Sequence, residues 1–420
     1  MIEKKSKNYI TQSPSAQQPF AIKLTNFLGR GLRTIGVTVP SLSPQFLLSN
    51  AKKQTGLSDF GDESFLPALD RLCQSLDTEA RLSQIGRIAA QGMLIDNLKI
   101  RLQLTDYRKQ RPEVTQQKIH RPLFVLGLPR TGTTILYELL AQDPAHRSPV
   151  SWEVSQPMPP AHPDTFFSDP RIAAVEDVLQ RTEILAPGFK AIHEMGSQLP
   201  QECVAILASH FISDQYGVTF FIPSYREWTR NQDMSKAYAW HYQFLQHLQV
   251  DYNKQRWVLK TPPHLAYLDA IVRQYPDAAI IQTHRDPMDV MGSISSLSCS
   301  LHGAFSDHID PAEIAANEVQ FFSKILKQGM AQRDAMPDRN SRFFHVQFSD
   351  IITDPIAIID KIYKHFGFDF SAGAQHAMQR YLDNRPRDKH GTHQYNLQDF
   401  NLSRQEHKSL FQEYNRRYGF

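Results

Sequence analysis

One eight-residue segment, GLPRTGTT from Gly127 to Thr134, limits the folds that this chain can adopt. An apolar run, LFVLGL, enters it, and the helical pattern TTILYELLAQ follows and stops before Pro144. Gly127 and Gly132 stand five residues apart, which is the glycine spacing of a phosphate-binding P-loop. Glycines let backbone N–H groups close around an oxyanion, and the N-terminus of the next helix adds its dipole. We therefore favour an anion site between a strand and a helix over a purely structural turn.

Other apolar runs indicate a parallel sheet around this loop. RWVLK, AAIIQTHR and FFHVQF each predict a buried strand. A well-delimited helix follows the last of them: Asp354 suits the N-cap, Pro355 the first turn and Gly367 the C-terminal cap. Strands that alternate with helices predict an α/β fold, with a P-loop-type parallel sheet flanked by helices.

Length and composition fit an ordinary globular protein. The chain has 420 residues, of which 41% are hydrophobic and 21% charged, and this excludes the disordered and collagen-like classes. Its 46 Lys and Arg residues against 43 Asp and Glu residues leave a formal charge of +3, too balanced for a nucleic-acid binder. We expect a helical N-terminal region over residues 1–110, a linker over 111–121 and the α/β domain, which carries the site, over 122–420.

Cysteine usage and hydropathy indicate a cytoplasmic protein. Cys73, Cys203 and Cys299 lie far apart, so they form neither a zinc set nor a disulfide framework, and free thiols fit a reducing cytoplasm. The basic start of the chain runs into polar residues where a secretory signal would carry an apolar core. No segment is apolar enough over a sufficient length to predict a bilayer-spanning helix.

The first 40 residues have a net positive charge, and the rest of the chain a net negative one. Six basic residues against one acid, Glu3, give +5 there, so the rest of the chain, within a total of +3, carries −2. A helical pattern puts an apolar face opposite a polar one: the first consists of Phe20, Leu24, Phe27, Leu28 and Ile35, the second of Lys23, Asn26, Arg30 and Arg33. Residues 20–35 thus suit weak contact with an anionic membrane surface. We favour the simpler interpretation, a helix docked on its own protein with its basic face in solvent.

The loop departs from the version found in nucleotide hydrolases. There a Lys after the second Gly reaches the β- and γ-phosphates, and the next hydroxyl holds Mg²⁺. Here Thr133 occupies the Lys position, and the cation, Arg130, lies inside the loop. We find no convincing strand that ends in an acidic metal ligand, since the strand before Asp286 ends in His284 and Arg285. The loop is thus suited to hold a nucleotide phosphate and a transferring anion without a metal.

A second motif, RDPMDVMGS, runs from Arg285 to Ser293 after the predicted strand AAIIQTH. Arg285 offers a forked phosphate donor, and Ser293 a hydroxyl eight residues on. The two motifs together resemble those of sulfotransferases that use 3′-phosphoadenylyl sulfate (PAPS), namely their 5′-phosphosulfate loop and their 3′-phosphate motif. The likeness runs from Pro122 to the C-terminus and points to the bacterial group whose loop begins with Pro-Arg. It implies a P-loop-type fold and metal-free transfer of a sulfuryl group from PAPS to a hydroxyl or amine.

The resemblance also implies roles for individual residues. Arg130 would hold the 5′-phosphosulfate; it replaces the Lys of cytosolic sulfotransferases, as in the tyrosylprotein branch. Lys260 in RWVLKTPPH would neutralise the leaving oxygen, as a Lys in a similar segment of that branch does, and an exposed Lys at a strand end is the alternative. Arg387 and Lys389 loosely match a segment that closes over the 3′-phosphate, although a solvated basic loop fits equally well. Further loop donors would be Thr131, Gly132, Thr133 and Thr134.

Three residues are candidates for the base that takes the acceptor's proton. Glu153 lies 23 residues after Arg130, close to the spacing of the catalytic Glu in the tyrosylprotein branch. Beside Trp152 its carboxyl would be desolvated, and desolvation raises a carboxyl pKa. His193 lies 63 residues after Arg130, at a distance comparable with that in cytosolic sulfotransferases, and an unperturbed His titrates near neutrality. We expect Glu153 to be the base, with His193 second and Glu202 third.

The sequence leaves the acceptor open among small-molecule, lipid and carbohydrate classes. Ten aromatic residues between positions 211 and 244 suit either packed helices or an apolar acceptor pocket. The rival enzyme class is a divergent P-loop kinase or NTPase, against which Thr133 and the missing acidic metal ligand argue. A third hypothesis is a non-catalytic nucleotide-binding or membrane-associated adaptor.

Overall fold

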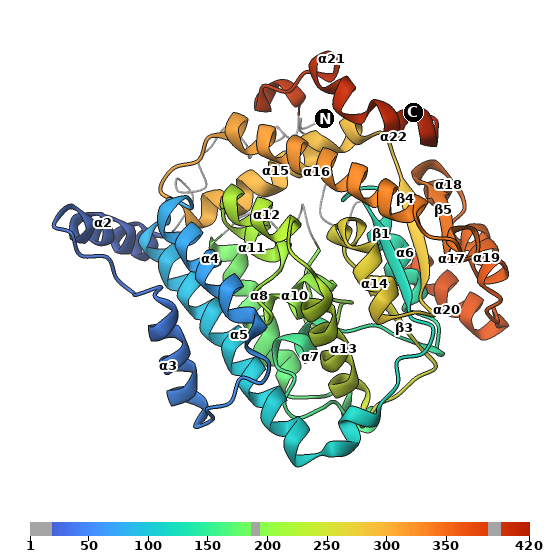
Figure 1. Ribbon diagram of the computed structural model, residues 1–420, viewed down its shortest axis with the longest axis horizontal. Helices are drawn as coiled ribbons and strands as arrows, with labels where there is room; N and C mark the ends of the chain where they lie inside the picture. The colour runs from blue at the N-terminus through green and yellow to red at the C-terminus, as the bar shows by residue number, and fades with distance from the viewer. Residues whose placement is uncertain (1–18, 186–193, 385–395) are drawn as a thin grey trace, which may run out of the picture.

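The computed structural model describes residues 19–185, 194–384 and 396–420, so His193, Arg387 and Lys389 lie outside the described part. A five-stranded parallel sheet occupies one side of the molecule, and helices flank it and form the rest (Figure 1). This arrangement confirms the predicted α/β class.

Strand order places the loop at residues 127–134 at the centre of the sheet. The order is β2-β3-β1-β4-β5, so β1 lies between β3 and β4. Val125 pairs with Lys260 on β3, and Gly127 pairs with Thr283 on β4. Because the carboxyl ends of parallel strands meet at one edge, the loop after β1 lies beside the ends of β3 and β4. The strands are β1 Leu123–Gly127, β2 His146–Arg147, β3 Arg256–Lys260, β4 Ala279–His284 and β5 Phe343–Gln347.

Strand β1 separates two cores. Phe124 and Leu126 belong to the larger core, whereas Leu123 and Val125 pack in a smaller one. The smaller core also contains α6 (Thr133–Leu140) and α19 (Pro355–Phe366). Burial on both faces explains why this strand is a continuous apolar run without alternation.

Helix α19 has the predicted boundaries. The Asp354 side chain accepts a hydrogen bond from the Ala357 N–H, Pro355 opens the helix, and Gly367 closes it at φ +63°. The two-residue strand β2 was not predicted, because two residues carry no periodicity that a sequence can reveal.

Helices account for most of the chain around the sheet. Before β1 they are α2 Phe20–Thr34, α3 Pro44–Thr55, α4 Leu66–Thr78 and α5 Gln84–Gln110. Between β2 and β4 they are α7 Ser151–Ser155, α8 Arg171–Leu185, α10 Cys203–Ala208, α11 Asp214–Thr219, α12 Pro223–Arg230, α13 Ser235–Gln249 and α14 Leu268–Gln274. After β4 they are α15 Pro287–Phe305, α16 Pro311–Asp334, α17 Arg339–Arg342, α18 Phe348–Thr353, α19, α20 Ala372–Asp383, α21 Arg404–His407 and α22 Gln412–Tyr418.

The larger core joins the N-terminal helices to the sheet. Leu69 of α4 and Leu98 of α5 lie in the same buried cluster as Phe124 of β1. Two aromatic residues of the 211–244 stretch, Tyr225 and Trp240, are buried in this cluster as well. Their side chains therefore serve packing between helices.

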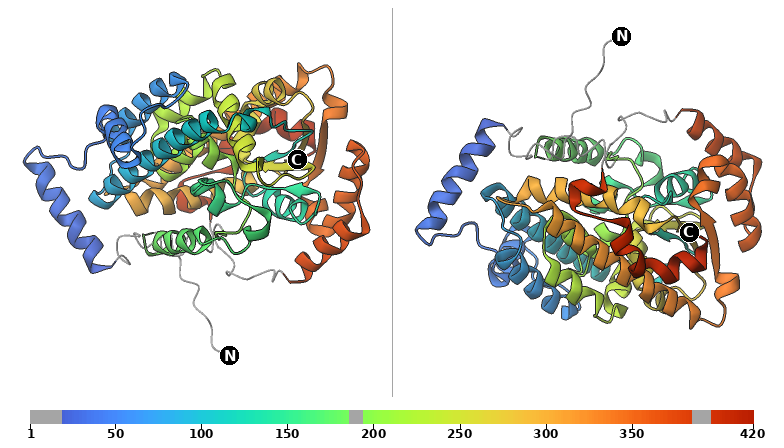
Figure 2. Two further views of the ribbon diagram at one scale, coloured as in Figure 1. Left: turned by 90° about the horizontal axis from the view of Figure 1, so that it is seen from below. Right: turned by 90° about the horizontal axis from the view of Figure 1, so that it is seen from above.

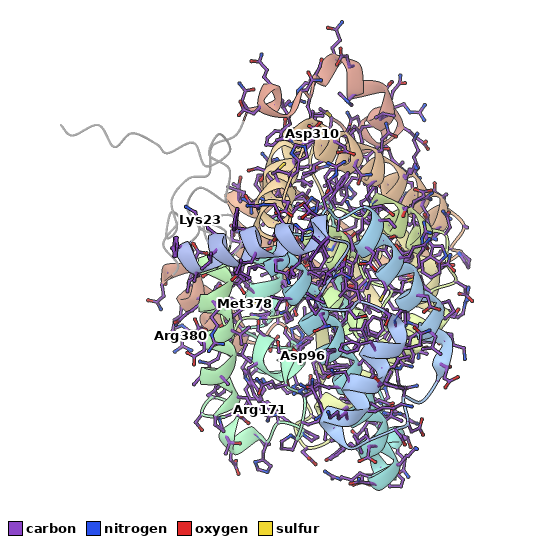
Figure 3. All side chains as sticks on the ribbon, turned by 90° about the vertical axis from the view of Figure 1, so that its left-hand side faces the viewer. Lys23, Asp96, Arg171, Asp310, Met378 and Arg380 are labelled. Atoms are coloured by element: carbon purple, nitrogen blue, oxygen red, sulfur yellow. The ribbon has the colours of Figure 1, made fainter. Side chains whose placement is uncertain are left out.

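Helix α2 does not pack in this way. It forms an arm at the outer edge of the molecule, beside α4 and α5 (Figures 1 and 2), and crosses the near face in Figure 3, where Lys23 marks it. Its apolar residues point outward, with Phe20 79% and Ile35 72% exposed. Its basic side chains Arg30 and Arg33 pair with Asp307. As we favoured from the sequence, the helix docks on its own protein, and the Arg30 side chain stays 53% exposed. It docks through Asn26 and Gly29, however, so the apolar residues that we expected to face the protein are in solvent.

Across the described ranges, no helix is both long enough and apolar enough to cross a membrane.

Candidate active site

Both loop glycines occupy positions that exclude a side chain. Gly127 has φ +152°, and a Cβ there would lie 2.2 Å from Thr283 Oγ1. Gly132 has φ +88°, and a Cβ there would lie 2.9 Å from Ile351 Cδ1. The backbone can therefore turn tightly into α6, whose N-cap is Gly132. This is the structural reason for the glycine spacing in the sequence.

A pair of threonines closes the base of the loop. The Thr131 hydroxyl lies 2.6 Å from Thr283 Oγ1 and donates to the Leu128 carbonyl at 2.6 Å. Thr131 is fully buried, so its side chain holds the loop in shape. Thr283 was not predicted as a site residue, although the polar end of a strand that begins with an apolar run was a usable signal.

Two arginines meet above the loop. Arg130 is exposed and has φ +67°, a left-handed conformation that is uncommon for a residue with a side chain. Arg285 donates through Nη1 to the Arg130 carbonyl oxygen at 3.2 Å, and its guanidinium lies 4.3 Å from the centre of the Phe348 ring. The guanidinium of the second motif thus contacts the backbone of the loop at Arg130. Ser293 lies further along, in α15, and is 3% exposed.

Lys260 lies at the end of β3 and contacts the first turn of α6. Its side chain is 4% exposed, which excludes the alternative of a solvent-exposed Lys. The ammonium forms an ion pair with Glu202 and donates to Thr134 Oγ1 at 3.3 Å. Thr261 donates through its hydroxyl to Glu202 Oε2 at 3.0 Å. Lys260, Glu202 and the loop helix therefore form one polar cluster.

Thr133 and Thr134 differ in exposure. Thr133 is 2% exposed, so its side chain lies inside the first turn of α6, whereas Thr134 is exposed beside Lys260. The Thr134 hydroxyl accepts a hydrogen bond from Lys260, which in turn pairs with Glu202.

Glu153, our first choice for the base, lies in a different environment. Its side chain is 1% exposed in α7, and Oε2 accepts from Arg147 Nη2 at 2.6 Å. Oε1 accepts from the Val150 N–H at 3.1 Å. Burial raises the pKa of Glu153, and the neighbouring guanidinium opposes that rise. Since both oxygens are engaged, the placement favours a structural role for this carboxylate and directs attention to Glu202.

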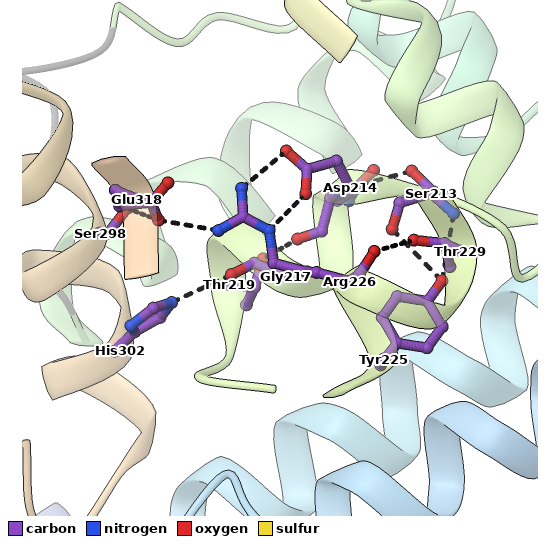
Figure 4. A network of polar contacts seen from close by, with 11 residues as sticks. Ser213, Asp214, Gly217, Thr219, Tyr225, Arg226, Thr229, Ser298, His302 and Glu318 are labelled. Atoms are coloured by element: carbon purple, nitrogen blue, oxygen red, sulfur yellow. Dashed lines mark hydrogen bonds and ion pairs between the residues drawn. The ribbon is translucent and has the colours of Figure 1, made fainter. Parts of the chain in front are cut away.

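A buried charge network holds the helix of the second motif. Arg226 donates to Asp214 Oδ1 at 2.8 Å and to Glu318 Oε1 at 3.0 Å (Figure 4). Ser298 of α15 donates to Glu318 Oε1 at 2.8 Å. Burial raises the pKa of Asp214 to about 6. The network connects α11 and α12 to α15 and α16. It therefore fixes the position of α15, the helix that carries Ser293.

The C-terminal segment supports the second motif from outside. Arg404 pairs with Asp286 at 2.6 Å and also with Asp289. The Tyr414 hydroxyl lies 2.8 Å from Nδ1 of His284, the residue before Arg285. Nothing in the local sequence indicated these contacts, because they join residues more than 100 positions apart.

Within residues 19–185, 194–384 and 396–420, no group of three or more His, Cys, Asp and Glu side chains is arranged to hold a metal ion. The proposed roles of His193, Arg387 and Lys389 stay predictions, because these residues lie outside the described part.

A sequence model of the sulfotransferase family matches residues 122–372, a range that contains the loop, Lys260 and the second motif. The chain belongs to the sulfotransferase family. This membership and the fold do not favour the alternative of a P-loop kinase.

The chain is similar in sequence to two mycobacterial sulfotransferases. Omega-hydroxy-beta-dihydromenaquinone-9 sulfotransferase Stf3 of Mycobacterium bovis and of Mycobacterium tuberculosis is 26% identical over 260 residues. The match covers 59% of this chain and 62% of each relative, so this sulfotransferase spans less than two thirds of their length.

Two solved structures share the fold over almost their whole length. Sulfotransferase STF1 from Mycobacterium tuberculosis has a TM-score of 0.78 at 33% identity, with 88% of this chain and 98% of that chain covered. Sulfotransferase STF9 from Mycobacterium avium has a TM-score of 0.81 at 28% identity, with 91% and 98% covered. The likeness therefore includes helices outside the range of the family model.

Proposed function

We propose that this sulfotransferase moves a sulfuryl group from PAPS to a hydroxyl group of its acceptor, with Glu202 as the base. The observation that carries the proposal is the contact of Lys260 with both Glu202 and Thr134. It brings a cation and a carboxylate to the first turn of α6, beside the loop that suits an anion. Family membership supports a sulfuryl donor, for which PAPS is the typical compound.

The residues around the loop fit the two phosphate ends of PAPS. Gly127 and Gly132 have no side chains, and a Cβ at either position would clash with a neighbour. We therefore propose that backbone N–H groups of the loop contact the anion. Arg130 and the N-terminus of α6 would bind the 5′-phosphosulfate. Arg285 and Ser293 would bind the 3′-phosphate, and we propose that Arg387 and Lys389 close over it. PAPS, when bound, supplies the sulfuryl group.

The chemistry requires placement of charge and of one proton. The acceptor oxygen forms a bond to sulfur while the bond from sulfur to the bridging phosphate oxygen breaks. Lys260 would stabilise the negative charge that develops on that oxygen, and Glu202 would accept the proton of the acceptor hydroxyl. Thr261 orients the Glu202 carboxylate through its hydrogen bond. As in phosphoryl transfer, positioning and charge stabilisation are expected to supply most of the rate acceleration, and in this proposal no metal takes part.

We propose a lipid alcohol as the acceptor. The name of the Stf3 relatives gives a hydroxylated menaquinone, which is a lipid, as their substrate. A carbohydrate hydroxyl is the alternative within the same chemistry. We also propose a cytoplasmic location, because PAPS would have to be available to the site.

Calorimetric titration with adenosine 3′,5′-bisphosphate in EDTA tests the donor site. We expect tight binding without metal, and Arg285→Ala to weaken it about 10- to 100-fold, since a hydrogen bond to a charged group contributes about 1.5–3 kcal/mol. Arg81→Ala, which removes a half-exposed surface arginine, is the matched control. Binding of ATP that requires Mg²⁺, without binding of the bisphosphate, would instead support a kinase.

A further inference from the structure

Helix α2 presents an apolar surface to the outside of the molecule. A surface helix of a globular protein normally turns its apolar stripe inward. Here six large apolar side chains on one stripe are between 37% and 79% exposed. We refer to them as the α2 stripe: Phe20, Leu24, Phe27, Leu28, Leu32 and Ile35.

Specific contacts on the opposite face fix this orientation. Asn26 is buried, and its Oδ1 accepts from the Ile85 N–H at 2.9 Å. Gly29 lies so close to Gln84 that a Cβ at this position would be 2.4 Å from the Gln84 side chain. The helix therefore contacts α5 through its small and polar residues. These contacts hold the α2 stripe on the solvent side of the helix.

Positive charge near the α2 stripe favours an anionic partner. Arg30 and Arg33 share one carboxylate, that of Asp307, and the Arg30 side chain is 53% exposed, so positive charge remains beside the α2 stripe. The sequence just before α2 adds three more cations, Lys4, Lys5 and Lys7, against one acid, Glu3. A second copy of the chain on the α2 stripe would bring two strongly basic segments together, and like charges across an interface are unfavourable. An anionic lipid surface complements both the apolar stripe and the cations.

We propose that α2 lies in the surface of an anionic membrane, with the α2 stripe at the boundary between headgroups and acyl chains. A further apolar residue of this kind is Val178 of α8, which is 55% exposed. Both views in Figure 2 place α8 and one end of α2 along the same edge of the molecule. The contact would hold the enzyme where a lipid acceptor resides. This last link rests on the proposed function, whereas the membrane contact does not.

Sedimentation of the full chain with vesicles tests the contact. We expect binding to vesicles of phosphatidylcholine with phosphatidylglycerol, weaker binding to phosphatidylcholine alone, and a decrease when salt is added. Phe27→Glu should weaken binding about tenfold or more, because one large apolar side chain leaves the lipid and a charge replaces it. Ile352→Glu, at a side chain that is 56% exposed in α18 against 65% for Phe27, is the matched control and should leave binding unchanged.

The outcomes separate the membrane from other partners and from catalysis. Absence of binding to anionic vesicles, or equal binding by wild type and Phe27→Glu, would overturn the proposal. So would light scattering that shows a dimer which Phe27→Glu converts to a monomer, without any vesicle binding. Sulfuryl transfer to a water-soluble alcohol should be the same in wild type and Phe27→Glu, so loss of the membrane contact and failure of the proposed function give different results.

Discussion

Replacement of Glu153 by Gln separates a structural carboxylate from a catalytic one. In the structure Glu153 and Arg147 form an ion pair whose side chains are 1% and 3% exposed. The substitution removes the negative charge but keeps the shape of the side chain. Arg147 is then left as a buried cation without its counter-charge, so we expect the folded protein to lose stability while the polar cluster at Lys260 stays intact.

The size of this loss follows from the surroundings of Arg147. Breaking a buried ion pair by removing one partner costs about 3–5 kcal/mol. Arg147 also donates to the Tyr252 carbonyl at 2.9 Å, and its guanidinium lies 4.6 Å from the Trp257 ring centre. These contacts remain in the variant, so we expect the lower end, about 3 kcal/mol. An unfolding entropy of about 2 cal/mol/K per residue gives a chain of 420 residues a shift of roughly 1 °C per kcal/mol, so the midpoint of thermal unfolding should fall by about 3 °C.

Thermal unfolding and turnover, measured on the same preparations, distinguish a structural from a catalytic role of Glu153. Glu153→Gln should unfold earlier and keep turnover per folded molecule within about threefold of wild type. Glu202→Gln should show the opposite pattern, with a nearly unchanged midpoint and turnover about 10²- to 10⁴-fold lower, because it removes the proposed base. A Glu153→Gln protein of normal stability whose turnover collapses would refute the reasoning and return Glu153 to the role of base.

Three further changes test other parts of the site. Arg130→Gly should raise stability by about 1 kcal/mol in urea titrations, because glycine adopts φ +67° without strain, yet abolish transfer; a variant that stays active would remove Arg130 from the mechanism. Lys260→Ala should lower turnover by about 10²-fold or more with little change in bisphosphate affinity measured by calorimetry, and an equal loss of both would assign it to binding. Burial raises the pKa of Asp214 from 3.8 to about 6, so the folded protein holds this proton more tightly than the unfolded chain does. Relative to Asp214→Asn, wild type should therefore lose on the order of 3 kcal/mol of stability between about pH 4 and pH 6, and parallel pH profiles of the two proteins would contradict this.

The central part of the fold was predictable because its physical causes are local. Strands β1, β3, β4 and β5 are apolar runs, and α19 carries its own caps at Asp354 and Gly367. The glycines of the loop were equally informative, because backbone geometry at Gly127 and Gly132 leaves no room for a side chain.

The choice among acids and the orientation of α2 depend on partners distant in sequence. Spacing from Arg130 suggested Glu153, but spacing does not reveal that Arg147 engages this carboxylate or that Lys260 lies beside Glu202. Likewise, periodicity shows that α2 has an apolar stripe but not which side of the helix meets α5. The side that faces α5 carries Asn26, which forms a hydrogen bond with the Ile85 N–H, and Gly29, which lies against Gln84.

The contacts of the C-terminal segment set an order of events during synthesis. The loop at residues 127–134 and the strands beside it leave the ribosome well before Arg404 and Tyr414, which support the turn at Asp286 and the strand end at His284. A nascent chain therefore contains the loop at residues 127–134 before it contains the residues that contact the turn at Asp286 and the strand end at His284. The contacts that hold this turn and this strand end can form only after residues 404–414 have been made.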